Sequence, residues 1–265
     1  MPLIITTPLS TNFSANSNSN SSTDGHSDTA SSAKQTERLT NGRFYATITH
    51  QSRLTKLSLA GMNKLYYVYD PMCSWCWGFK PAWEKIERAL SGEVEIVYLL
   101  GGLAPDSDQP MPAAMQQQIA AHWHRIESQL GTKFNHEFWT INTPRRSTYP
   151  ACRAILAART QQAEPQMLTA IQEAYYLQAR NPSDNVVLID LANNLGLDKA
   201  RFCIDLLSET TQQALLAEIQ FTQSIGGNSF PSLFVHTPAG ITPIIVDYQN
   251  ADTSIQQVRE AIEFK

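Results

Sequence analysis

The sequence predicts an α/β fold in which a sheet-forming region is interrupted by a long helical segment. Three observations carry this prediction: a strand–helix–strand pattern over 65–100, mostly helical patterns over 104–225, and a strand–strand–helix pattern from 232 onwards. A strand, a helix and a second strand of these lengths imply a right-handed parallel crossover. We therefore expect an α/β core with an inserted α-helical domain.

The first unit combines two buried strands with one amphipathic helix. Leu65–Asp70 is a continuous run of mostly aromatic and aliphatic residues, which predicts a buried strand that ends at Pro71. Apolar and aromatic residues at helical spacing predict a helix over Trp75–Leu90, which we expect Pro81 to kink. Val94–Leu100 is predicted to be the second buried strand.

The middle of the chain is predicted to be helical. Asp184 and Asp198 are candidate N-caps, and Gly196 is a candidate helix stop. The expected helices cover 111–130, 147–162, 164–180, 184–195, 198–207 and 209–225.

Strand character returns near the C-terminus. Ser232–His236 and Ile241–Asp247 are predicted strands, and Pro238-Ala239-Gly240 between them is typical of a hairpin turn. A last helix is expected over Thr253–Phe264.

The Cys73-Ser74-Trp75-Cys76 run lies where the first strand gives way to the first helix. A Cys-x-x-Cys pair at such a junction presents a reactive dithiol. The free N–H groups and the dipole at a helix N-terminus favour a thiolate on the first cysteine. The second cysteine, one turn deeper, is close enough to form a disulfide with the first.

Three segments together resemble one known family. Tyr69–Phe79, which contains the Cys-x-x-Cys pair, resembles the active-site segment of DsbA-family proteins, especially the FrnE-like branch of predicted protein-disulfide isomerases. Gly226–Val235 is similar to the thioredoxin-fold loop in which a cis-proline precedes a core strand. Arg145–Ala154 resembles the start of a helix in the inserted domain of this family.

The resemblance implies a thioredoxin fold and a thiol–disulfide oxidoreductase. It assigns 62–103 and 226–265 to the thioredoxin-fold domain and 104–225 to the inserted helical domain, and it leaves out 1–61. It implies that Cys73 is the nucleophile and Cys76 the resolving cysteine. It also implies that Pro231 is a cis-proline that brings the backbone of Phe230 beside the dithiol, and Trp75 is a candidate for contact with substrate.

Other interpretations of the same residues stay open. The Cys73 and Cys76 pair could be half of a zinc site, but this is disfavoured because Cys152 and Cys203 form no second pair. Cys152 and Cys203 are expected to be small core residues. Phe79 and Trp83 are expected in the core, whereas Trp75 is expected to be exposed. His122 and His124 are expected to be solvated. The motif therefore predicts no metal and no cofactor beyond the redox-active pair, with glutathione as a candidate co-substrate.

Two alternative functions remain. Kappa-class glutathione transferases and hydroxychromene-carboxylate isomerases are similar in architecture, but they typically have a serine where Cys73 stands. A noncatalytic binding or redox-sensing protein would use the pair only as a switch. The Arg145-Arg146 pair is either an anion site, for example for glutathione, or a helix-flanking surface feature.

Composition limits the partners. The chain has 265 residues and a formal charge of −4, without the basic stripe that nucleic-acid binding needs. No run of about 18 apolar residues predicts a membrane span. Residues 10–37 are rich in Ser, Asn and Thr, so 1–61 is expected to be a disordered extension or to precede a natural start at Met62. Because Met1–Ile5 is a poor signal peptide, we expect a cytoplasmic protein whose partners are disulfide or dithiol proteins and small thiols.

Overall fold

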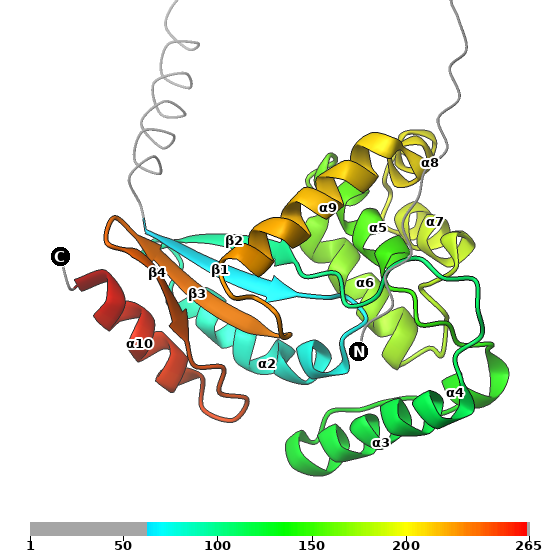
Figure 1. Ribbon diagram of the computed structural model, residues 1–265, viewed down its shortest axis with the longest axis horizontal. Helices are drawn as coiled ribbons and strands as arrows, with labels where there is room; N and C mark the ends of the chain where they lie inside the picture. The colour runs from blue at the N-terminus through cyan, green and yellow to red at the C-terminus, as the bar shows by residue number, and fades with distance from the viewer. Residues whose placement is uncertain (1–62, 264–265) are drawn as a thin grey trace, which may run out of the picture. The chain divides into compact units, whose positions relative to one another are not determined.

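The computed structural model describes residues 63–263, and the predicted extension 1–61 lies outside them. The described chain forms a four-stranded sheet in the order β2-β1-β3-β4 with helices on both faces (Figure 1). The elements in chain order are β1 (Lys64–Tyr69), α2 (Ser74–Ala89), β2 (Glu95–Leu100), α3 (Ala113–Leu130), α4 (Phe138–Ile141), α5 (Tyr149–Arg159), α6 (Glu164–Tyr176), α7 (Asn185–Asn194), α8 (Lys199–Leu207), α9 (Glu209–Ser224), β3 (Ser232–Thr237), β4 (Gly240–Ile244) and α10 (Ala251–Glu263).

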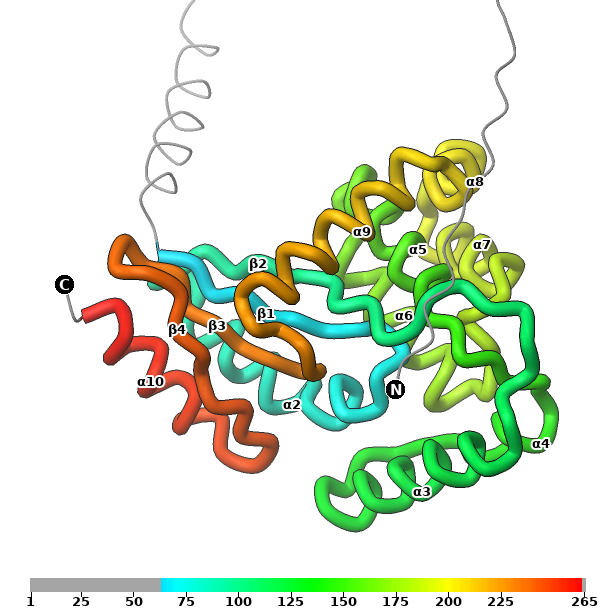
Figure 2. Tube along the Cα trace, viewed as in Figure 1, coloured from blue at the N-terminus to red at the C-terminus, as the bar shows by residue number. Residues whose placement is uncertain are grey.

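The sheet joins strands that are far apart in the sequence. β1 pairs in parallel with β2, as the predicted crossover requires, and β1 pairs antiparallel with β3 so that Tyr67 lies opposite both Tyr98 and Leu233. β4 pairs antiparallel with β3 at the other edge. The end of β1 therefore lies beside the loop before β3, although helices α3 to α9 separate the two strands in the sequence (Figure 2).

Alternation along β1 divides the core between the two sheet faces. Leu65, Tyr67 and Tyr69 belong to the main core cluster, which also holds buried residues of α2, α10 and the inserted helices. Tyr66 and Val68 point to the opposite face, where the ring of Tyr66 meets Phe221 of α9 edge-on at 5.6 Å. Such alternation is what a strand buried on both faces requires.

The predicted fold class, α/β with an inserted α-helical domain, is confirmed. Each predicted helix is present with ends shifted by a few residues, and α2 runs unbroken through Pro81. The short helix α4 was missed. Asp198 caps α8 by accepting a hydrogen bond from the Arg201 N–H at 3.0 Å, whereas Asp184 makes no such bond at the start of α7. The domain bounds stay a prediction.

Candidate functional site

Cys73 occupies the N-cap position of α2. Its backbone is extended, with φ −81° and ψ 116°, and its carbonyl accepts a hydrogen bond from the Trp77 N–H at 3.1 Å. Its own N–H donates to the carbonyl of Asp70 at 3.0 Å, which closes the turn after β1. The first cysteine therefore lies at a helix N-terminus, where free N–H groups stabilise a negative charge.

The two cysteines differ in their access to solvent. Cys76 is fully buried, whereas Cys73 keeps 7% of its surface exposed and lines a cavity. Burial, together with the adjacent Cys73 thiol, raises the pKa of Cys76 well above its ordinary value. The arrangement thus favours the protonated thiol of Cys76, and of the two sulfur-bearing residues only Cys73 lines this cavity.

The loop before β3 faces the dithiol. The Cys73 thiol donates to the carbonyl of Phe230 at 3.5 Å, and the Phe230–Pro231 peptide bond is cis. Phe230 is half-buried and lines the cavity, whereas Pro231 is buried behind it. Of the predicted pair, only Phe230 therefore lines the cavity, and the substrate contact expected of both residues stays a prediction.

Gly101, directly after β2, leaves the space that the Phe230 ring occupies. A Cβ atom added at this position would lie 1.7 Å from Cε1 of that ring. No side chain larger than hydrogen fits there unless the ring moves. This contact between two loops fixes one wall of the cavity that faces Cys73.

Trp75 lies between the dithiol and the C-terminal part of the chain. The expected exposure of this residue is only partly met, because its ring is half-buried and meets Tyr248 edge-on at 5.4 Å. Phe79 and Trp83 are buried in the core, as predicted. Trp75 still lines the cavity beside Cys73, and its contact with substrate stays a prediction.

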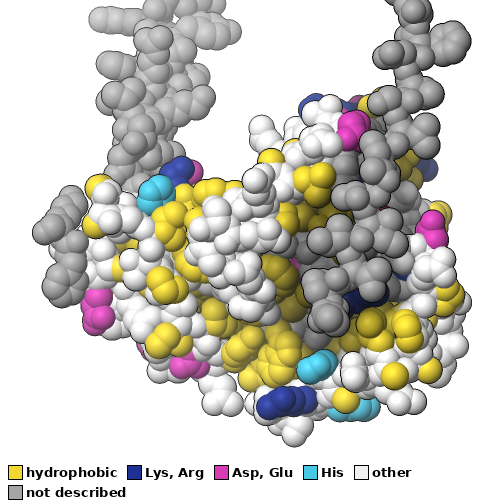
Figure 3. Space-filling model, viewed as in Figure 1, with side chains coloured by type: hydrophobic (Ala, Val, Ile, Leu, Met, Phe, Trp, Pro, Cys, Tyr) yellow, Lys and Arg dark blue, Asp and Glu magenta, His cyan; other side chains and the backbone are white. Residues whose placement is uncertain are grey.

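The cavity beside Cys73 has a volume of about 430 Å³ and a mixed lining. Its apolar wall includes Met111, Met115 and Ile119, and Arg145 and Arg146 lie on its polar side. Arg145 is engaged by Asp184 and by the Ser183 carbonyl, whereas Arg146 forms no ion pair within residues 63–263. On the face drawn in Figure 3, hydrophobic side chains form a patch in the lower centre of the view.

A buried carboxylate behind the dithiol was missed by the sequence analysis. Both oxygens of Asp70 accept hydrogen bonds, from the N–H groups of Met72 and Leu103 at 2.8 and 2.7 Å and from the Thr148 hydroxyl at 2.7 Å. Burial raises the pKa of Asp70, and these hydrogen bonds oppose the rise. Asp70 thereby ties the dithiol turn to the loop after β2 and to the start of α5.

A second charged cluster fastens the helical segment to the end of the sheet. The Arg159 guanidinium binds Glu164 at 2.6 Å and Glu218 at 2.7 Å. Glu218 also accepts the N–H of Leu100 at 2.6 Å, and the Tyr69 hydroxyl donates to Glu164 at 3.3 Å. The ends of β1 and β2, which carry the site, are therefore held by residues of α5, α6 and α9.

The predicted burial of the remaining cysteine and histidine residues is confirmed except at Cys203. Cys152 is fully buried, as expected, and its thiol points to Asp70 at 3.6 Å. Cys203 was expected in the core but is half-buried, because its position on the short helix α8 faces partly outward. His122 and His124 are exposed, as expected. The described residues contain no helix with the length and apolar character of a membrane span.

Comparisons with known proteins agree with this geometry. The family described as Thioredoxin matches residues 66–243. A crystal structure titled a "putative protein disulfide isomerase" from Nitrosomonas europaea has a TM-score of 0.67 and 29% identity, covering 76% of this chain and 97% of that one. The cytosolic disulfide reductase DsbM from Pseudomonas aeruginosa has a TM-score of 0.60 and 22% identity over 76% of this chain and 97% of its own, a likeness of fold.

Among curated proteins, the ClpXP adapter protein SpxH is similar to part of the chain. The SpxH of Halalkalibacterium halodurans is 26% identical over 175 residues, which cover 64% of this chain and 57% of that protein. The SpxH of Bacillus subtilis is 26% identical over 174 residues, with the same coverage. This chain thus spans little more than half the length of these relatives.

Proposed function

The chain belongs to the thioredoxin family, and we propose that it is a thiol–disulfide oxidoreductase that reacts through Cys73 and Cys76. The observation that carries this proposal is the geometry of the pair. Cys73 lies at the start of α2, lines a cavity and faces the Phe230 carbonyl at 3.5 Å, while Cys76 is buried one turn behind it.

The reaction proceeds in two exchanges. The Cys73 thiolate attacks one sulfur of a substrate disulfide, so that the substrate S–S bond breaks, a mixed disulfide forms and one substrate sulfur leaves as a thiolate. Cys76 then loses its proton and attacks Cys73, which releases the second substrate sulfur as a thiol. The substrate has gained two electrons, and the protein holds a Cys73–Cys76 disulfide. The reverse sequence oxidises a substrate dithiol.

The cavity supports two kinds of substrate contact. An extended peptide would pair with the exposed backbone before Pro231 as an added strand, with Trp75 and Phe230 beside it. A small anionic thiol such as glutathione would place a carboxylate near Arg146. The peptide and the small thiol would each bring a sulfur atom to Cys73, so the same exchange reaction would act on either substrate.

The test uses the full chain with a glutathionylated peptide as substrate. Turnover is measured as loss of glutathione from the peptide, with excess reduced glutathione present to return the Cys73–Cys76 disulfide to the dithiol. Mixed disulfides are detected by mass spectrometry after acid quenching of reactions without that reductant. We expect the wild-type protein to turn over and Cys73→Ser to show neither release nor a mixed disulfide. We expect Cys76→Ser to accumulate the mixed disulfide through Cys73. Cys203→Ser, which removes a half-buried cysteine of α8, is the matched control and should behave as wild type.

The other outcomes identify the alternatives. Full turnover by Cys76→Ser would contradict two-cysteine exchange and favour a glutathione-dependent transferase or isomerase, which does not need the second thiol. If wild type forms no mixed disulfide with the peptide and no internal disulfide in oxidising glutathione buffer, the exchange proposal fails. A binding role, as the name of the SpxH relatives states for those proteins, would then be favoured.

A further inference from the structure

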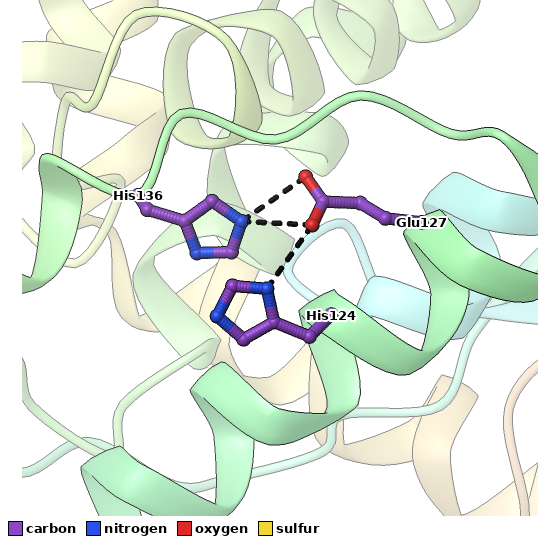
Figure 4. Close-up of side chains that lie close together, drawn as sticks. All are labelled: His124, Glu127 and His136. Atoms are coloured by element: carbon purple, nitrogen blue, oxygen red, sulfur yellow. Dashed lines mark hydrogen bonds and ion pairs between the residues drawn. The ribbon is translucent and has the colours of Figure 1, made fainter.

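Away from the dithiol, three side chains of metal-binding chemistry converge on one point. His124 and Glu127 lie one turn apart on α3, and His136 follows in the segment after that helix. One candidate ligand atom from each lies within 4.8 Å of the others (Figure 4). We propose that these three residues bind one divalent transition-metal ion such as Zn²⁺.

The spacing of the donor atoms fits a shared ion. Nδ1 of His124 lies 3.3 Å from one Glu127 oxygen, and Nε2 of His136 lies 3.0 Å from both oxygens. Zinc bonds nitrogen and oxygen at about 2.0–2.2 Å, so adjacent ligand atoms around it lie about 3.0–3.5 Å apart. The contacts to the carboxylate already have this separation.

The two histidine rings of the cluster face one carboxylate side by side. The two imidazole rings stack with their centroids 4.2 Å apart and their planes 10° from parallel, and both turn a nitrogen to the same carboxylate. Hydrogen bonds from the rings to the carboxylate would hold the same three side chains together without an ion, and the zinc titration below distinguishes the two arrangements.

The donor set also indicates the class of ion. Two imidazoles and one carboxylate suit zinc, nickel, cobalt or copper better than calcium or magnesium, which prefer oxygen ligands. The side chain of His124 is 66% exposed, so further coordination positions face solvent. The site therefore has three protein ligands with room for water or an external ligand, unlike a closed structural site.

Buried aromatic residues hold the third ligand in place. Trp123, next to His124 on α3, is fully buried and meets the ring of His136 edge-on at 5.8 Å. The N–H of Asn135 donates to the carbonyl of Tyr176 at 2.6 Å, which anchors the backbone beside His136. An ion bound here would join the last turns of α3 to the segment over 131–137.

This segment in turn contacts the helix that carries the dithiol. The indole N–H of Trp77, the residue after Cys76, donates to the Lys133 carbonyl at 3.1 Å. The Trp77 ring also stacks on Tyr176 with the centroids 5.6 Å apart. Metal binding would thus stiffen the surface against which the first turns of α2 rest.

The test is isothermal titration of the metal-free full chain with ZnCl₂. Because zinc also binds thiolates, the titration is done with a Cys73→Ser/Cys76→Ser protein, and each variant is added to that background. We expect one zinc ion per chain, and at least a tenfold loss of affinity in His136→Ala. His122→Ala is the matched control, since His122 is an exposed histidine of α3 outside the cluster and should leave affinity unchanged.

Further variants keep the proposal falsifiable if His136→Ala does not fold. Glu127→Gln keeps the size and hydrogen-bonding capacity of the side chain but removes its charge, and it should also lower affinity at least tenfold. Circular dichroism without zinc should show every compared protein folded. The proposal is overturned if the background protein binds no zinc at 0.1 mM, or if the cluster variants bind as tightly as the His122→Ala control. These outcomes do not depend on whether the dithiol is active.

Discussion

The contact between Gly101 and Phe230 gives the sharpest test of how the site is held. In Gly101→Ala the new Cβ would lie 1.7 Å from Phe230 Cε1, so the ring must retreat by about 1.7 Å to reach the 3.4 Å at which ordinary contact begins. Overpacking of this kind costs about 1–3 kcal/mol. At about 2–4 °C per kcal/mol for a domain of this size, the melting temperature should fall by about 2–12 °C.

The control is Gly101→Ala in a protein that lacks the Phe230 ring. Urea denaturation of Gly101→Ala, Phe230→Ala and the double variant gives the coupling between the two positions. In the Phe230→Ala background the added methyl group meets no aromatic ring, so its cost should fall below about 0.5 kcal/mol. Equal destabilisation in both backgrounds, or none in either, would refute the assigned packing.

The same variant tests the link from packing to chemistry. The displaced ring must either rotate into the cavity or carry its backbone along, and both alter the wall that faces Cys73. Because displacements of about 1 Å can cost about a hundredfold in rate, turnover of the glutathionylated peptide should fall by about tenfold to a hundredfold. Wild-type turnover in Gly101→Ala would show that the ring does not position the substrate.

Three further predictions concern the groups behind the site. Thr148→Val removes the hydroxyl that donates to Asp70 and accepts a buried backbone N–H, so urea denaturation should show a loss of about 1–3 kcal/mol that Thr148→Ser restores. Burial raises the pKa of Asp70, so near pH 4 and above the folded chain retains a proton that the unfolded chain releases. The folded state is therefore destabilised as the pH rises from about 4 through the folded pKa of Asp70. The unfolding free energy of Asp70→Asn should therefore improve relative to wild type as the pH rises, and parallel curves over pH 4–8 would contradict this assignment. Arg159→Lys cannot bind Glu164 and Glu218 with the same forked geometry, so it should cost about 1 kcal/mol at this partly exposed site, and the cost should shrink in high salt.

Local sequence patterns predicted the elements and the position of the dithiol. A continuous run of aromatic and aliphatic residues before Cys73 gives β1, and helical spacing after it gives α2, because both patterns lie within one stretch of chain. The loop around Pro231 was expected near the dithiol from its resemblance to a known fold. Its distance from Cys73 depends on the pairing of β1 with β3, which the structure supplies.

The contacts missed by the sequence analysis join segments without a shared local pattern. Nothing near Asp70 indicates that Thr148 would bond to it, and nothing near Gly101 indicates that Phe230 would occupy its space. The exposure of His124 was predicted correctly, but its contact with His136 was missed, because His136 lies beyond the end of the helix. Most sequences contain several aspartate and histidine residues, and tertiary packing decides which of them come into contact.

The pairing of β1 with β3 has a consequence for synthesis of the protein. Cys73 and the Phe230 carbonyl that faces it lie 157 residues apart in the chain. At about 5–20 residues per second, the ribosome needs about 8–30 s to add the second after the first. During that interval the nascent chain already carries both thiols of the pair, while the loop that shields them has not been made. Under the proposed chemistry, a newly made chain would therefore be open to disulfide exchange with its neighbours before the loop that faces Cys73 exists.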